Sequence, residues 1–283
     1  MMITTQRFSG PLAEDWAEPK HGLVLYWLGQ AGFALAYEGI HLLIDPYLSD
    51  YLAKKYADGD LSHERMMPPP IDPGKFGNLD FVLTTHGHGD HMDPETLRII
   101  TTLYPSCRYI VPSAELKYAL SIPLSSERLI GADSGQALAL DKKLTVAPVP
   151  AAHETLTVDS SGSHHFLGYL LQFPGMTIYH SGDSVPYGGL TEILRAQRIH
   201  LALLPVNGRD SERLAKGIAG NFTLAEAIDL CRLARIPTLI AHHYGMFAFN
   251  TIDPETIDQA ARAEKEIQVY RAEVNIRYCL EPS

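Results

Sequence analysis

The stretch "THGHGDHMD", residues 85–93, gathers three histidines and two aspartates into nine positions, with two glycines between them. A single histidine of this kind is most often a hydrogen-bonded residue of the protein core. Three imidazoles at such close spacing are typical of metal ligands instead. The stretch therefore predicts a metal-binding segment, and the rest of the chain can be interpreted around it.

The placement of the stretch supports this interpretation. His86 and His88 follow the apolar run "LDFVLTT", so an extended backbone would project both imidazoles from one face towards a shared ion. We expect Gly87 and Gly89 to allow the turn that follows. Asp90 then lies near the start of the next predicted helix and can face the same space. Imidazole and carboxylate ligands together suit zinc, manganese or iron better than magnesium or calcium.

Composition limits the classes of protein to consider. The chain has 283 residues, a length that fits one or two domains, and the absence of a linker favours a single α/β domain over residues 1–283 with a polar leader at 1–20. A formal net charge of -10 argues against a nucleic-acid partner, which needs clustered Lys and Arg.

The sequence also predicts where the protein works. No run of about 18 apolar residues is present, which predicts no membrane span, and the first residues lack the apolar core of a secretory signal. Cys107, Cys231 and Cys279 are odd in number, widely spaced and without a CxxC pair. This pattern suits free thiols in a reducing cytosol and predicts a cytoplasmic protein.

Strand-like and helix-like segments alternate along the chain. "LVLYWLG", "GFALAY" and "IHLLIDP" predict an antiparallel meander, with a tight turn at Glu38 and Gly39. "DPETLRIITTLY" predicts a helix with Asp93 as N-cap and Pro94 at the first helical position. Residues 54–76 are rich in Pro, Gly and charge, lack either periodicity, and predict a long loop that could cover a site.

Three later stretches place further candidate ligands directly after predicted strands. His153 follows "LTVAPVP", Asp183 follows "MTIY" and two small residues, and His242 and His243 close "PTLIA". Any one of them alone would carry little weight. Their common position at strand ends is what makes them candidates for one site.

Together these residues resemble the metallo-β-lactamase-fold hydrolases, and the likeness extends over residues 45–243. The HxHxDH signature of that family is present, and the later His, Asp and His occur in family order: His86, His88, Asp90, His91, His153, Asp183 and His243. The resemblance implies a four-layer αβ/βα sandwich with the metals at one edge of its two sheets. It also implies that His86, His88 and His153 hold one ion, that Asp90, His91 and His243 hold the other, and that Asp183 bridges them.

The resemblance gives weaker indications for three more residues. The dipeptide that joins His243 to Tyr244 follows the ligand strand in similar sequences, which favours His243 as ligand and places His242 on the opposite face, in the core or behind the ligands. Asp45 in "LLIDP" resembles the aspartate that orients a ligand imidazole, although an Asp-Pro turn would also explain it. His180 either lines the pocket or faces solvent from its strand end.

Such a site would perform hydrolysis. Two divalent transition-metal ions, Zn²⁺ or Mn²⁺ with Fe also acceptable, roughly 3.5–4 Å apart can hold a bridging hydroxide and polarise a carbonyl or phosphoryl oxygen. Asp90 could orient this nucleophile and pass its proton to the leaving group. Redox relatives on the fold carry Glu where this chain has His88, which argues against an oxidoreductase.

Other stretches bear on the substrate. "WLGQAGFAL", "PVNGRD" and "GNFTLAEA" resemble the branch of L-ascorbate-6-phosphate lactonase, which predicts a small anionic, phosphorylated lactone or ester and makes a homo-oligomer plausible. Asn207, Arg209 and Asn221 are then candidates for contacting the anion, although the same residues also suit a turn and a helix start.

Two alternatives stay open. "MMPPPIDP" and "YHSGD" resemble the N-acyl-phosphatidylethanolamine phospholipase D-like branch, which would make the enzyme a phosphodiesterase. The polar "ADGDLSHER", with His63 and Arg65, favours the smaller substrate. The other alternative is a non-catalytic metal-binding scaffold. A complete ligand set argues against it, because buried Asp and His without a role are costly.

Overall fold

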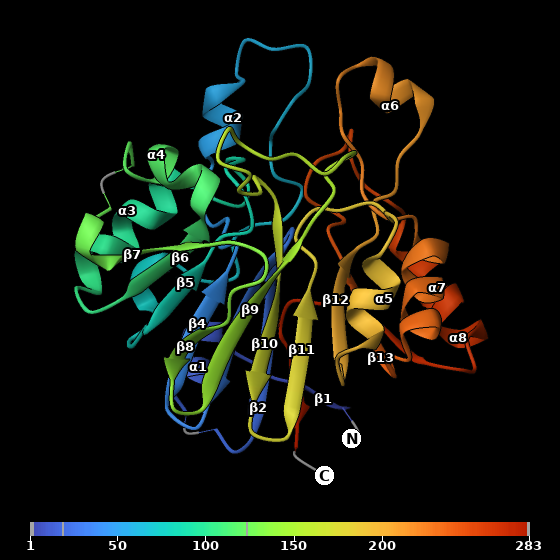
Figure 1. Ribbon diagram of the computed structural model, residues 1–283, viewed down its shortest axis with the longest axis horizontal. Coiled ribbons are helices and arrows are strands. Elements are labelled where there is room, and N and C mark those ends of the chain that lie inside the picture. Colours follow the sequence, from blue (N-terminus) through green and yellow to red (C-terminus); the bar gives the residue numbers. More distant parts are fainter. Residues whose placement is uncertain (1–2, 19, 123, 282–283) are drawn as a thin grey trace. The chain divides into compact units, whose positions relative to one another are not determined.

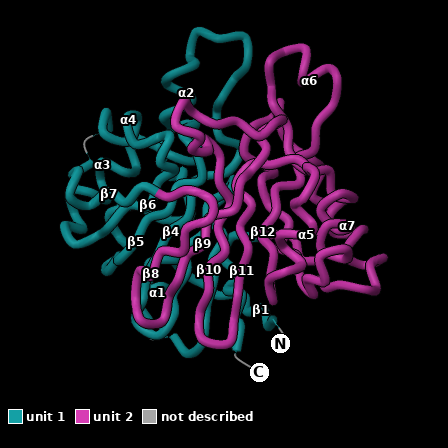
Figure 2. Tube along the Cα trace, viewed as in Figure 1, with its two compact units in different colours: residues 1–131, 273–283 teal, residues 132–272 magenta. Residues whose placement is uncertain are grey.

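The computed structural model describes residues 3–18, 20–122 and 124–281, and the chain forms two compact units (Figure 2). The first unit consists of Met1–Gly131 together with Glu273–Ser283, and the second is Ala132–Ala272. Each unit contains one mixed β-sheet with its own helices. The predicted α/β class is therefore confirmed.

The first unit is built on an eight-stranded sheet in the order β1-β15-β2-β3-β4-β5-β6-β7. Its strands are β1 (Ile3–Arg7), β2 (Leu23–Gly29), β3 (Gly32–Tyr37), β4 (Ile40–Ile44), β5 (Phe81–Leu83), β6 (Arg108–Pro112), β7 (Leu129–Ala132) and β15 (Ile276–Leu280). Its helices are α1 (Leu12–Ala17), α2 (Tyr51–Lys55), α3 (Pro94–Leu103) and α4 (Leu116–Ala119), with short 3-10 turns η1 (Pro73–Lys75), η2 (Ser113–Glu115) and η3 (Ser126–Arg128).

The second unit is built on a seven-stranded sheet in the order β14-β13-β12-β11-β10-β9-β8. Its strands are β8 (Leu138–Asp141), β9 (Leu144–Pro150), β10 (Leu167–Phe173), β11 (Met176–His180), β12 (Leu201–Pro205), β13 (Thr238–His242) and β14 (Gln268–Arg271). Its helices are α5 (Leu190–Arg195), α6 (Ser211–Ala215), α7 (Leu224–Ala234) and α8 (Pro254–Ala263). In this unit α7 packs against β12 and β13 (Figure 1). Helix α8 packs against β14.

Both sheets combine an antiparallel part with a parallel part. The predicted meander is confirmed: β2, β3 and β4 pair antiparallel, and the turn between β3 and β4 uses positive φ angles of 42° at Glu38 and 88° at Gly39. From β4 to β6 the pairing is parallel, as it is from β11 to β14. Parallel strands end at the same edge of their sheet, and this is where the loops that carry candidate site residues begin.

The start of the chain has more structure than a polar leader. Strand β1 pairs antiparallel with β15, so that Ile3 lies opposite Leu280, and α1 buries Leu12 and Trp16. Strand β1 was not predicted because its sequence, ITTQR, does not alternate between apolar and polar residues. Accordingly, four of its five side chains are exposed. Among the described residues, no helix is long and apolar enough to cross a membrane.

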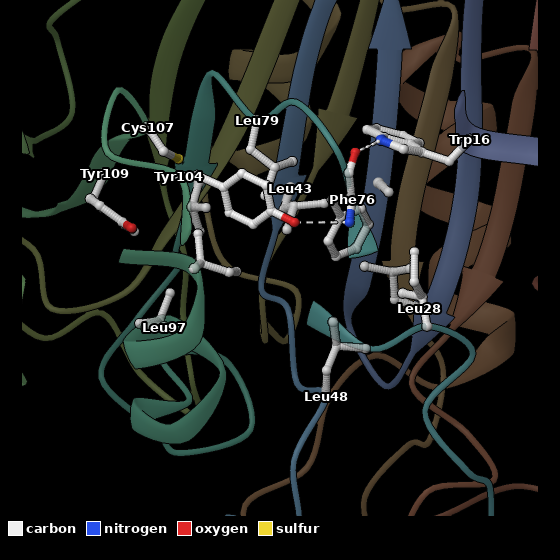
Figure 3. Close-up of a cluster of buried hydrophobic side chains, with 14 of the residues drawn as sticks. Trp16, Leu28, Leu43, Leu48, Phe76, Leu79, Leu97, Tyr104, Cys107 and Tyr109 are labelled. Carbon is white, nitrogen blue, oxygen red and sulfur yellow. Dashed lines mark hydrogen bonds between the residues drawn. The ribbon is translucent and has the colours of Figure 1, made fainter. Parts of the chain in front are cut away.

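A buried cluster in the first unit fixes the end of the 54–76 segment (Figure 3). Phe76 is 1% exposed, and its backbone is held on both sides by side chains from elsewhere in the unit. Its N–H donates to the Tyr104 hydroxyl at 2.9 Å, and its carbonyl accepts from Trp16 Nε1 at 2.6 Å. Hydrogen bonds of this kind satisfy backbone groups that water cannot reach.

We expect Tyr104→Phe to lower the free energy of unfolding by about 1–3 kcal/mol, because the buried Phe76 N–H would lose its acceptor. Urea unfolding followed by circular dichroism measures the change. Tyr56→Phe is the matched control, since the Tyr56 side chain is exposed and its replacement should change stability by less than about 0.5 kcal/mol. Equal stability of both variants would contradict the role given to Tyr104.

Candidate metal centre

The HxHxDH segment forms a tight turn between β5 and α3. His88 C=O accepts from His91 N at 3.0 Å and from Met92 N at 2.8 Å, which bends the backbone instead of extending it. The ring centroids of His86 and His88 are 4.6 Å apart, and those of His86 and His91 are 4.0 Å apart. The turn thus brings three imidazoles together within the first unit. His86 and His91 are buried and His88 is exposed.

Asp45, which directly follows β4, holds this turn through hydrogen bonds. It is fully buried, and its carboxylate accepts from Thr85 N at 2.8 Å, from Thr85 Oγ1 at 2.7 Å and from His91 Nδ1 at 2.7 Å. The contact with His91 is the arrangement that the sequence predicted for Asp45. Thr85 was not singled out from the sequence, because an isolated threonine carries no motif.

These bonds determine which nitrogens face a ligand. A carboxylate only accepts, so His91 Nδ1 carries the proton and the Thr85 hydroxyl donates to Asp45. The Thr85 oxygen is then the acceptor for His86 Nδ1, 3.1 Å away. Neutral His86 and His91 both present an unprotonated Nε2, the form in which imidazole binds metal ions. The donor set of the first unit therefore fits a transition metal.

The two glycines of the segment have a different role from the one expected. Neither Gly87 nor Gly89 has a positive φ, so the turn does not need glycine for its backbone angles. A Cβ on Gly87 would collide with the Glu115 carboxylate, and one on Gly89 would lie 2.8 Å from both Tyr51 Cε1 and Leu52 Cδ2. At both positions glycine leaves room for the close approach of neighbouring side chains.

Arg65 joins the 54–76 segment to the loop after β4 through hydrogen bonds. The guanidinium donates from Nη1 to the carbonyls of Tyr47 and Ser49, at 3.0 and 3.2 Å, and from Nε to that of Met67 at 3.1 Å. Its Cζ lies 4.7 Å from the centroid of the buried Tyr47 ring, and burial raises the pKa of the Tyr47 hydroxyl well above its usual range. Arg65 is thus engaged in anchoring the loop.

In the second unit, Asp183 lies between two candidate ligands. Its Oδ2 is 3.2 Å from His243 Nε2 and 4.0 Å from His153 Nε2. The loops that carry Asp183 and His153 are tied together, since Ala152 N donates to Ser184 Oγ at 3.1 Å and Val185 N donates to Ala152 C=O at 2.8 Å. A carboxylate with two imidazole nitrogens within 3.2 and 4.0 Å fits the donor set of a transition metal.

The structure distinguishes the two neighbouring histidines after β13. His243 leaves the strand with φ of 63° and turns towards Asp183. His242 is fully buried, and its ring stacks on His180 at 5.2 Å. Burial lowers the pKa of His242 well below its ordinary value, and the neighbouring His180 adds to this effect, which favours the neutral form of His242.

His180 is buried, which excludes the interpretation of a histidine that faces solvent. Its Nδ1 accepts from Gly182 N at 3.0 Å, so the neutral ring carries its proton on Nε2. This bond also shapes the short loop that leads from β11 to Asp183.

The predicted anion contacts form a hydrogen-bonded network within the second unit. Asn207 and Asn221 are buried, and Asn221 Nδ2 donates to Asn207 Oδ1 at 3.1 Å. Arg209 binds Glu226 with both Nη atoms, at 2.7 and 2.6 Å. This pair raises the pKa of Arg209 and lowers that of Glu226. Contact of these residues with a substrate anion stays a prediction, and Arg209 would have to exchange Glu226 for it.

Comparison with known proteins gives the family. The sequence profile described as "Beta-lactamase superfamily domain" matches residues 41–244, well over half of the chain. The chain belongs to the metallo-β-lactamase superfamily. The match begins in β4, just before Asp45, and ends just after His243, so it includes every candidate ligand.

Relatives within this superfamily carry names that describe hydrolases. The chain is 28% identical over 233 residues to a "UPF0173 metal-dependent hydrolase" of Caldivirga maquilingensis, covering 82% of this chain and 86% of that one. It is 24% identical over 252 residues to "N-acyl-phosphatidylethanolamine-hydrolyzing phospholipase D 1" of Caenorhabditis elegans, covering 85% and 68%.

Among solved structures, the fold is similar to that of a possible metal-dependent hydrolase from Veillonella parvula, with a TM-score of 0.72 at 16% identity, covering 92% and 99% of the two chains. The predicted metallo-β-lactamase fold is confirmed, and this superfamily member is a metal-dependent hydrolase. The hydrolase names of the relatives argue against the scaffold alternative.

We expect Asp45→Asn to lower zinc affinity by about 10–100-fold, because the amide cannot replace the carboxylate that orients His91 and Thr85. Asn tolerates the positive φ of 44° at this position, so the backbone should persist. Competition with a chromogenic zinc chelator measures the affinity, and Asp58→Asn at the exposed end of the 54–76 segment is the control. Unchanged affinity in Asp45→Asn would refute the orienting role.

Proposed function

We propose that this hydrolase has a dinuclear centre of Zn²⁺ or Mn²⁺, with Fe also acceptable. In this proposal the ligands are those that the family resemblance implies: His86, His88, Asp90, His91, His153, Asp183 and His243. One ion is assigned to His86, His88 and His153, the other to Asp90, His91 and His243, with Asp183 shared between them.

One observation supports this assignment most strongly: the Asp45–Thr85 pair fixes the proton of both His86 and His91 on Nδ1. With the proton held on Nδ1, the Nε2 atom of each imidazole is left to bind a metal ion, which is the usual arrangement of metal-ligating histidines. In the second unit, the contact of 3.2 Å between Asp183 and His243 supports the same interpretation.

Bound metal ions would supply an activated water molecule at neutral pH and polarise the bond that is cleaved. The residues of the chain do the rest. Asp90 is the carboxylate that we propose to orient the attacking water and to carry its proton to the leaving group. The buried His86 and His91, held by Asp45 and Thr85, keep the site in one geometry before substrate arrives.

For the substrate, we propose a small anionic lactone or ester, such as a phosphorylated one. The buried amides of Asn207 and Asn221 and the guanidinium of Arg209 support a polar binding region in the second unit. Asn221 also precedes α7, whose capping box is formed by Thr223 and Glu226. Backbone N–H groups at such a helix start favour negative charge.

A phosphodiesterase is the second candidate, and two observations favour it. One is the similarity to a phospholipase D of the N-acyl-phosphatidylethanolamine type. The other is the surface of the 54–76 segment, where Arg65 is engaged with backbone carbonyls while Tyr56 and Met66 are 41% and 58% exposed. Exposed apolar side chains on this loop would suit contact with a lipid more than contact with a sugar acid.

We also expect a reducing, cytoplasmic location, because all three cysteines are free and two of them are buried. A homo-oligomer is expected only from the lactonase resemblance.

A substrate panel separates the two candidates. Purified protein reconstituted with zinc or manganese is assayed on γ-butyrolactone and a phosphorylated sugar lactone, on bis-p-nitrophenyl phosphate, and on N-acyl-phosphatidylethanolamine in mixed micelles. We expect the highest kcat/KM on the phosphorylated lactone. Preference for the phospholipid would establish the second candidate, and lack of metal-dependent turnover on every substrate would remove both.

Two histidine variants test the ligand assignment independently of substrate. We expect His243→Ala to bind one ion fewer per chain and to lose at least about 100-fold in kcat, whereas His242→Ala keeps both ions. Elemental analysis of the two proteins gives the stoichiometry, and Asp183→Ala should bind fewer ions in the same way. If His242→Ala loses an ion and His243→Ala does not, the metal ligand is His242 and the assignment of His243 is wrong.

A further inference from the structure

Gln30 occupies the tight turn between β2 and β3, in the stretch "WLGQAGF". Its backbone is left-handed, with φ of 51°, and Gly29 before it has φ of 95°. Turns of this kind are usually made by Gly, Asn or Asp, because other residues are strained there. A glutamine at this position therefore needs an explanation beyond the turn itself.

The contacts of the Gln30 side chain explain its presence in the turn, because the side chain points into the first unit and its amide reaches Asp90. Gln30 is 1% exposed, and its Nε2 donates to Asp90 Oδ2 at 2.7 Å. The turn is held in place by Trp27 Nε1, which donates to Gln30 C=O at 3.0 Å. Backbone and side chain are thus both held, and the amide cannot turn away without breaking its part-buried hydrogen bond to Asp90.

The contact with Asp90 also orients the amide. A carboxylate only accepts, so the atom next to Oδ2 must be the nitrogen, and Oε1 faces the other way. Within the described part of the chain, Oε1 is buried and receives no hydrogen bond. A buried acceptor without a donor is unfavourable, and native proteins retain such atoms mainly where a ligand or water supplies the donor.

We propose that Gln30 is a positioning residue of the reaction. Its Nε2 holds the Asp90 carboxylate in one orientation, and its Oε1 accepts a hydrogen bond from an O–H or N–H group of the bound ligand, which is either the attacking water or the substrate. This inference rests on the proposed function only in treating Asp90 as part of the metal centre. It adds a residue that the ligand motif does not contain.

The first test measures zinc affinity, which needs no substrate. We expect Gln30→Met, which keeps the length of the side chain but cannot donate, to weaken zinc binding about 10-fold. Gln30→Glu should weaken it further, because a second carboxylate would face Asp90. Gln30→Gly relieves the backbone strain while removing the amide, so it keeps the test valid if the longer variants fold poorly. Gln6→Met, on the exposed face of β1, is the matched control.

The zinc measurement separates the possible failures. If wild-type protein binds no zinc, the proposed function fails and the role of Gln30 fails with it. If wild-type protein binds zinc and all three Gln30 variants bind it equally well, only the inference about Gln30 is overturned. Full affinity in Gln30→Gly together with loss in Gln30→Met would assign the effect to the backbone and also overturn it.

The second test identifies the donor that meets Oε1. Hydrolysis of γ-butyrolactone, which has no O–H or N–H group, is compared with hydrolysis of α-hydroxy-γ-butyrolactone in wild-type and Gln30→Met proteins saturated with zinc. A loss of kcat that is equal on both lactones, with KM unchanged, assigns the donor to water. A loss confined to the hydroxylated lactone, seen mainly in KM, assigns it to the substrate. Unchanged kcat and KM on both would refute the acceptor role of Oε1.

Discussion

The bond between Asp45 and His91 is the interaction on which the rest of the site depends. The fully buried Asp45 carboxylate accepts hydrogen bonds from His91 Nδ1 and from the N–H and hydroxyl of Thr85. Because the Thr85 hydroxyl donates to Asp45, its oxygen accepts from His86 Nδ1, which places the proton of His86 on that nitrogen. The sheet places this carboxylate next to Thr85 because β4 and β5 run parallel and end at the same edge. Without it, the imidazoles of the turn would have no fixed tautomer and no fixed orientation.

Strain in the backbone accompanies these contacts. Gln30, Asp45 and His243 are non-glycine residues with φ of 51°, 44° and 63°, a conformation that costs on the order of 1–3 kcal/mol at each position. Each of them directly follows the last residue of a strand and carries a side chain that contacts a candidate ligand or serves as one. The sheets are well buried, and their stability can offset this cost. At these three positions, the contact that the side chain makes at the candidate site gives the strained backbone a role.

Sequence patterns predicted the elements whose signals are local. The Pro94 helix with its Asp93 cap and the meander of β2 to β4 were both recognisable from short segments. The pairing of Ile3 with Leu280 was not, because strand pairing across the whole chain leaves no local pattern. The role of Gly87 was wrongly assigned to backbone freedom, since the neighbouring Glu115 side chain cannot be recognised from the sequence. Gln30 lies in "WLGQAGFAL", a stretch that carries the lactonase resemblance but gives no local sign of the contact with Asp90.

The central claim is that the oriented histidines and aspartates bind metal ions. Elemental analysis of wild-type protein, purified without chelators and again after reconstitution with zinc or manganese, tests it most directly. We predict close to two transition-metal ions per chain, as expected for a dinuclear hydrolase. Protein that retains no metal under either condition would contradict the account, and the buried network around Asp45 would then need an explanation in stability alone.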